Sequence, residues 1–130
     1  MTNRTLEQQR AAAALDFVQG QQNNENQRAR LHTLIQKAPI MILQNGLGQT
    51  LAFLLSKAET KDGQHNAEKL LHDQVDDWLR QQQKIYPVEE TLIHQLTEKG
   101  RLDYLRAQQE SLALLSWMKK FAEAWLKEGE

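Results

Sequence analysis

The side chains that could bind a metal ion gather in the segment from residue 65 to residue 77 of this sequence. His72 and Asp76 are four residues apart, and His65 precedes His72 by seven, so one helical face could present all three to Zn²⁺. Asp73 and Asp77 add carboxylate oxygens of the kind that hard cations prefer. Histidines and carboxylates on a glutamine-rich surface are more often solvent-facing than ligating. The sequence therefore predicts no metal site.

The sequence contains no set of residues with the spacing of a known catalytic site. The chain has no cysteine, and none of its serines lies in a G-x-S-x-G turn, so the usual nucleophiles are missing. Its carboxylates fall at helix positions that the pattern predicts to be exposed, whereas general acid–base catalysis needs groups that converge in a water-poor cleft. The glycines at 46 and 48 lack the Gly-Lys-Ser/Thr that completes a phosphate-binding loop. We expect no catalytic residue, no cofactor and no small-molecule substrate.

Basic side chains that could contact phosphate are most in excess in the first half of the chain. Residues 1–57 contain six Lys or Arg against three Asp or Glu, residues 58–99 five against nine, and residues 100–130 five against five. Such side chains would support RNA without reading its sequence. A net charge of −1 and few spare aromatic residues argue against tight, independent RNA binding. The candidates are Arg4, Arg10, Arg28, Arg30, Lys37, Lys57, Lys119 and Lys120.

The elements that must position these side chains are all predicted to be helices. Thr5 and Gln8 have the spacing of a capping box, which predicts a helix over residues 4–19. A second helix is expected to begin with a cap at Asn24 and Gln27, and Pro39 must end it, kink it or open the next helix. We predict an all-α fold, a single compact bundle of about five to six helices with a long C-terminal helix, in one domain spanning residues 1–130.

The most apolar segment, residues 40–57, contains Gly46 and Gly48 and predicts two short helices or one broken helix. Glycine costs about 1 kcal/mol relative to alanine in a helix interior, so two within three residues mark a bend or a site of close backbone contact. No run of about 18 apolar residues and no export signal is found, which predicts no membrane association and a cytoplasmic location.

Three helices are expected after a loop at residues 61–63. The first has its apolar period over residues 71–82 and ends at Tyr86 and Pro87, the second is a short helix around residues 92–96, and Lys99 and Gly100 signal its C-terminal cap. The last helix, about residues 101–127, is apolar on more than one side, so it is either central to the bundle, which we favour, or partly covered by another subunit. No segment has the pattern of a strand. The seam of the last helix consists of Ala107, Ser111, Leu114, Met118, Phe121 and Trp125.

Three segments together carry a resemblance to a known family. They are Arg10 with Ala11, the run APIMILQNGLGQTLAFLLSK at residues 38–57, and the run WMKKFAEAWL at residues 117–126. With the chain length and the order of helices, they resemble the small subunit of the type III-B CRISPR effector, the Cmr complex. The central run is the most specific of the three.

The resemblance implies a non-catalytic subunit of an RNA-guided effector used in antiviral defence. Such a subunit stacks with other effector subunits and with copies of itself as an inner filament, and contacts the duplex of guide RNA and target RNA through phosphates. Carried onto this sequence, the matching positions that we expect to bind RNA are Arg10, Lys57, Lys119 and Lys120. Asn45, Gly46 and Gln49 also match, and together with Gly48 we expect them at the bend or subunit contact. Leu47, Phe53 and Trp117 also match the family, and we expect these side chains to lie in the core. Pro39 matches the family as well.

Two other functions stay open from the residues alone. The long C-terminal seam is equally typical of a helical adaptor or oligomerisation module with no nucleic-acid role. A metal-dependent nuclease would need RNA cleavage that depends on Asp76 or Asp77, and we expect none.

Overall fold

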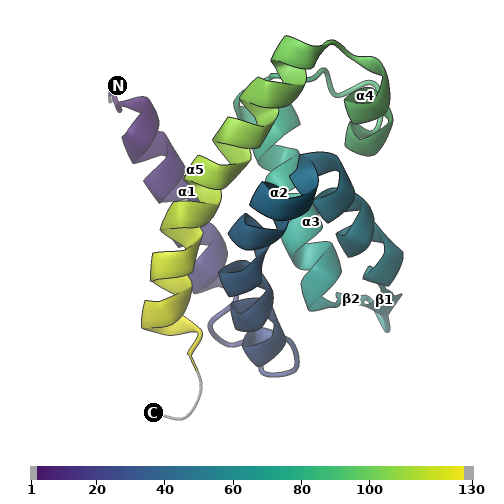
Figure 1. Cartoon of the computed structure of the whole chain (residues 1–130). Helices are drawn as coiled ribbons and strands as arrows, with labels where there is room; N and C mark the ends of the chain where they lie inside the picture. Colours follow the sequence, from purple (N-terminus) through teal and green to yellow (C-terminus); the bar gives the residue numbers. More distant parts are fainter. Residues whose placement is uncertain (1–2, 128–130) are drawn as a thin grey trace.

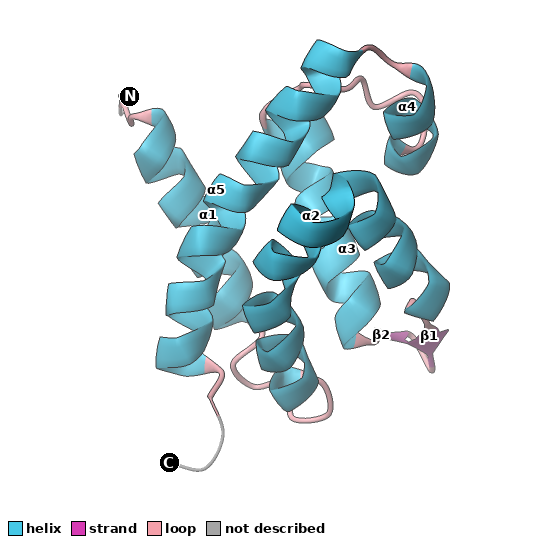
Figure 2. Cartoon of the chain, in the orientation of Figure 1, coloured by secondary structure: helices cyan, strands magenta, loops and turns pink. Residues whose placement is uncertain are grey.

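The structure is a computed structural model that describes residues 3–127, and its helices confirm the predicted all-α class and the long C-terminal helix (Figure 2). A π-helical turn, η1, continues α3, and a small hairpin of two strands joins α2 to α3. The helices and strands are α1 (Leu6–Gly20), α2 (Arg28–Lys57), β1 (Thr60–Lys61), β2 (Gln64–His65), α3 (Ala67–Asp77), η1 (Trp78–Gln82), α4 (Leu92–Glu98) and α5 (Arg101–Trp125).

The start of α1 follows the sequence prediction, and the start of α2 does not. The Thr5 hydroxyl accepts a hydrogen bond from the Gln8 amide at 3.0 Å, and the Gln8 side chain accepts one from the Thr5 amide at 2.9 Å, so the predicted capping box is confirmed. α2 begins only at Arg28. The predicted side-chain cap at Asn24 is wrong, because the side chain of Asn24 donates to Gln21 while its carbonyl accepts from the amide of Arg28.

The hairpin between α2 and α3 was not predicted. Asp62 and Gly63 both have positive φ, 53° and 76°, as the central residues of a tight hairpin turn require. Asn66 secures the segment, since its side-chain oxygen accepts from the amides of Glu59 and Lys69 and its amide donates to the carbonyl of Lys57. An Asp-Gly pair is a hairpin signal, but the arms of two residues each are too short to show an alternating pattern.

α2 runs through Pro39 and breaks at Gly46. Within α2 only Gly46 departs from helical dihedrals, with φ 89° and ψ 161°, so the boundary considered at Pro39 is wrong and the alternative of one broken helix is correct. The two halves of α2 run in different directions from this point, and α5 lies beside α2 (Figure 1). The break redirects a helix of 30 residues that would otherwise extend about 45 Å.

The core lies between α5 and the helices that pack on it. α5 contacts both α1 and α2, and α2 also packs along α3, so the predicted central position of the last helix is confirmed. The buried face of α5 follows the predicted seam through Met118. It then continues with Ala122 instead of Phe121, so Phe121 and Trp125 are only partly buried. The buried residues of the seam are Ala107, Ser111, Leu114 and Met118.

α2 is the one helix among residues 3–127 that is long and apolar enough to cross a membrane by length and composition. The core helices of water-soluble proteins meet the same two criteria. Nine residues of α2 are buried in this protein, and the helix is broken at Gly46. The expectation of no membrane association stays a prediction.

We predict that Gly46→Ala lowers the free energy of unfolding by about 1–3 kcal/mol, because a φ of 89° is strained for an alanine. The added Cβ would also lie 3.1 Å from the hydroxyl oxygen of Tyr104. Urea unfolding followed by circular dichroism measures the difference.

Gly20→Ala is the matched control for this substitution. Gly20 ends α1 without a positive φ, and nothing lies within 4 Å of its added Cβ. We expect this variant to be as stable as the wild type or more stable by up to about 1 kcal/mol. Equal effects of the two substitutions would show that the break at Gly46 carries no strain cost.

Candidate functional site

The two glycines lie where α2 breaks against α5. A helix that restarts leaves amide groups without partners, and α5 supplies the acceptors. The amide of Leu47 donates to the side-chain oxygen of Gln108 at 3.0 Å, and the amide of Gly48 donates to the hydroxyl of Tyr104 at 2.8 Å. A Cβ at Gly48 would lie 3.3 Å from that hydroxyl. The close backbone contact is therefore made, within the chain, to its own α5.

The neighbours of these glycines divide between core and surface. Leu47 is fully buried, whereas Asn45 and Gln49 are exposed on the outer side of the break. Phe53, expected in the core, is 37% exposed. Asn45 and Gln49 are therefore accessible to another subunit.

Arg10 is held by a carboxylate of α5. Its Nε and one terminal nitrogen donate to the two oxygens of Glu110 at 2.7 and 2.8 Å, a bidentate pair, and its other terminal nitrogen donates to Glu7 at 3.0 Å. Glu110 also accepts from the indole nitrogen of Trp78 at 3.1 Å. This one carboxylate thus ties α1, α5 and η1 together, and a phosphate would have to compete with it for Arg10.

The Arg10 hydrogen bonds control the ionisation of Glu110. They lower the pKa of its carboxyl, burial opposes them by raising it, and the Trp78 indole lowers it further. The same pair raises the pKa of Arg10. Both groups are therefore charged at neutral pH, so the link between α1 and α5 is an ion pair.

Two other arginines from the basic set are also engaged in the fold. Arg30 forms an ion pair with the buried carboxylate of Glu68, which joins α2 to α3. Arg28 donates to the carbonyls of Leu126 and Lys127, which follow α5, each at 3.4 Å. The sequence alone could not show that these two arginines are engaged within the fold and are not available to RNA, because their partners lie far away along the chain.

The lysines from the resemblance are exposed. Lys119 and Lys120 are neighbours on α5, and in the part of the chain that the structure describes neither forms an ion pair. Lys120 reaches only the hydroxyl of Ser116, at 3.5 Å. Lys57 is exposed at the end of α2, beside the hairpin. The structure thus brings two of the four predicted RNA-binding residues together on one helix.

The residues considered for metal binding enter separate interactions. His72 is buried, contrary to the expected exposure, and its Nδ1 lies 2.9 Å from an oxygen of Asp73. Asp76 pairs with Arg80, while His65 contacts the hydroxyl of Thr60 in the hairpin. Burial raises the pKa of Asp73, but hydrogen bonds from His72 and from Lys69 outweigh it and leave the pKa lowered.

Another group of two carboxylates and a histidine lies exposed at α4 and in the loop just before it. Glu90, His94 and Glu98 are four residues apart, with their ligand atoms within 4.8 Å of one another. His94 lies 3.1 Å from Glu98 as an i,i+4 pair on α4, and 3.7 Å from Glu90, which precedes the helix, so surface ion pairs account for the arrangement.

The fold and the site define a class: a small helical protein whose buried charges link its helices and whose exposed lysines Lys119 and Lys120 lie on the long C-terminal helix α5. The family model described as CRISPR-associated protein (Cas_Cmr5) matches residues 6–125. The crystal structure of a CRISPR-associated Cmr5 family protein from Thermus thermophilus is similar, with a TM-score of 0.76 and 31% sequence identity, over 95% of this chain and 100% of that chain. The chain belongs to the Cmr5 family of CRISPR-associated proteins.

We predict that Glu110→Gln lowers the free energy of unfolding at neutral pH by about 1–3 kcal/mol, because it removes the charge that Arg10 faces. Folding lowers the pKa of Glu110, so its stabilisation is complete above the pKa of the unfolded chain and is lost as the pH falls toward the lowered value. The difference between the wild type and the variant should therefore shrink in acid. Urea unfolding at a series of pH values measures it.

Glu7→Gln is the control, since it removes the other partner of Arg10, whose side chain is 61% exposed. We expect a loss below about 0.5 kcal/mol. A Glu110→Gln variant with the same deficit at every pH would rule out a contribution from the ionised carboxylate.

Proposed function

We propose that this chain is a non-catalytic subunit of an RNA-guided type III-B effector, the Cmr complex, in the cytoplasm. It stacks with other subunits and with copies of itself as an inner filament, and it helps to hold the target RNA paired with the guide RNA. Membership of the Cmr5 family supports the assignment to the complex.

The observation that carries the RNA role is the pair of free lysines on α5. Lys119 and Lys120 are exposed, whereas Arg10 is bound to Glu110. A phosphate could bind either lysine without breaking an ion pair among the described residues, which makes α5 the favoured face for RNA. Arg10 in this proposal acts through its pair with Glu110, by holding α1 against α5.

Exposed apolar side chains support the stacking role. Leu43 on α2 is 71% exposed and Leu102 on α5 is 81% exposed, with Ile40 also largely outside the core at 53%. Apolar side chains of this size are favourable contacts when a neighbouring subunit covers them. The same residues would serve an adaptor without a nucleic-acid role, so RNA binding needs its own test.

We predict that Lys119→Glu with Lys120→Glu weakens the binding of target RNA by the assembled effector. Each lost phosphate contact should reduce the dependence of log K on log salt by about 1, so the loss is larger at about 50 mM salt than at about 200 mM. Binding of labelled target RNA to the reconstituted, guide-loaded complex measures both values.

Lys61→Glu with Lys99→Glu is the matched control. Both lysines are exposed, in the acidic middle segment, and the change in net charge is identical. We expect target RNA binding close to that of the wild type. If the two double variants lose equal affinity, or if the loss at α5 does not depend on salt, the phosphate contact at Lys119 and Lys120 is refuted and the adaptor role is favoured.

A further inference from the structure

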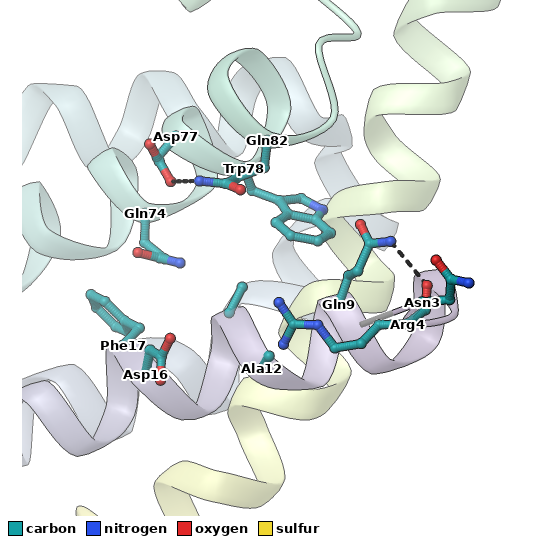
Figure 3. Close-up of a pocket in the computed structure, with 11 residues that line it drawn as sticks. Asn3, Arg4, Gln9, Ala12, Asp16, Phe17, Gln74, Asp77, Trp78 and Gln82 are labelled. Atoms are coloured by element: carbon teal, nitrogen blue, oxygen red, sulfur yellow. Dashed lines mark hydrogen bonds between the residues drawn. The ribbon is translucent and has the colours of Figure 1, made fainter. Parts of the chain in front are cut away.

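A polar groove of about 580 Å³ lies between α1 and the segment formed by α3 and η1 (Figure 3). It shares no residue with the α5 lysines or with the break in α2. Its walls come from residues 3–17 on one side and residues 74–82 on the other.

The groove exists because α1 presents alanines where the two walls approach each other. Ala12 and Ala13 lie along it, with side chains too small to fill the space beside the buried Trp78. The sequence places a run of four alanines at residues 11–14, which favours the helix strongly but supplies little volume. Opposite this run, η1 continues α3 as the far wall.

Both walls of the groove carry a carboxylate, and the α1 wall also carries an arginine. Asp16 on α1 and Asp77 at the end of α3 lie on opposite sides of the groove, with the ring of Phe17 and the amide of Gln74 between them, while Arg4 extends into the groove from the start of α1 (Figure 3).

Most of these groups have no partner in the protein itself. Asp77 accepts only from Gln82, at 3.3 Å, and over residues 3–127 the side chains of Arg4, Asp16 and Gln74 form no hydrogen bond or ion pair. The groove therefore has an acidic part next to an aromatic ring, and a single cation.

We propose that this groove is a docking site for an extended polypeptide segment of another effector subunit, one that inserts a lysine or arginine side chain between Asp16 and Asp77. The inserted cation faces two carboxylates and the ring of Phe17, which is favourable for both ion pairing and cation–π contact. Arg4 pairs with an acidic residue of the same segment. This inference rests on the proposed function, because it names a kind of partner for the subunit.

The lining favours a polypeptide over the other ligands. Amide side chains both donate and accept hydrogen bonds, which matches the backbone of an extended peptide. The amides that line the groove are Asn3, Gln9, Gln74 and Gln82. An RNA strand would bring phosphates toward Asp16 and Asp77, where like charges repel. The docking of RNA here would overturn the proposal.

Photo-crosslinking in the reconstituted, guide-loaded complex tests the site. The probe is p-benzoylphenylalanine in place of Gln74, and the control is the same probe in place of Gln81, which is exposed on η1 but does not line the groove. We expect a protein cross-link at position 74, mapped by mass spectrometry to a partner segment containing Lys or Arg, and little at position 81.

Charge reversal distinguishes this site from general surface effects. Asp16→Lys with Asp77→Lys should reduce the cross-link at position 74 on the order of tenfold, because like charges then meet. Asp16→Asn with Asp77→Asn should reduce it less, and replacing the captured basic residue with glutamate should restore the cross-link in the lysine variant. The control, Glu25→Lys with Glu89→Lys, makes the same change in charge at exposed positions outside the groove and should leave the cross-link unchanged.

The outcomes separate this inference from the proposed function. A chain that does not enter the complex refutes both. A chain that enters the complex but gives no cross-link at position 74, a cross-link to RNA, or a captured peptide without a basic residue refutes the groove assignment and leaves the subunit role standing.

Discussion

The interruption of α2 at Gly46 is the constraint on which the arrangement of the helices depends. A straight helix of this length would extend about 45 Å, whereas both halves of α2 contribute buried apolar residues to the core of a small protein. The break solves this problem but leaves amides that need acceptors, and Tyr104 and Gln108 of α5 provide them. The bend in one helix and the position of another are thus fixed by the same two hydrogen bonds.

A second interaction that sets the positions of the helices is made by the carboxylate of Glu110, which joins α1 and η1 to α5. A partly buried carboxylate is costly unless its partners satisfy it, and here a bidentate guanidinium and an indole do so. The pairing also decides which basic residues remain available. Arg10 and Arg30 hold helices together, and the exposed lysines of α5 stay free for a ligand.

As a result, the surface of the protein has three separate regions that could contact other molecules. The α5 lysines, the exposed apolar residues of α2 and α5, and the groove beside α1 share no residue. A subunit built into a larger assembly must meet several neighbours at once, and separate regions allow each contact to form without displacing another. The groove also carries mostly acidic charge, opposite to that of the two lysines, so electrostatics alone would direct different partners to the two regions.

The sequence by itself determined the helical class, the capping box at Thr5, the seam along the last helix and the weak point at Gly46. Each of these depends on neighbours within about one or two helical turns, where spacing and backbone preference act directly. The hairpin at Asp62 and Gly63 was not predicted because its arms are too short to show a strand pattern, and α2 continues through Pro39 with helical dihedrals. The tertiary structure alone decided that Arg10 meets Glu110, 100 positions away, and that Asp16 and Asp77 line one groove. Such pairings follow from the packing of whole helices, which no local pattern encodes.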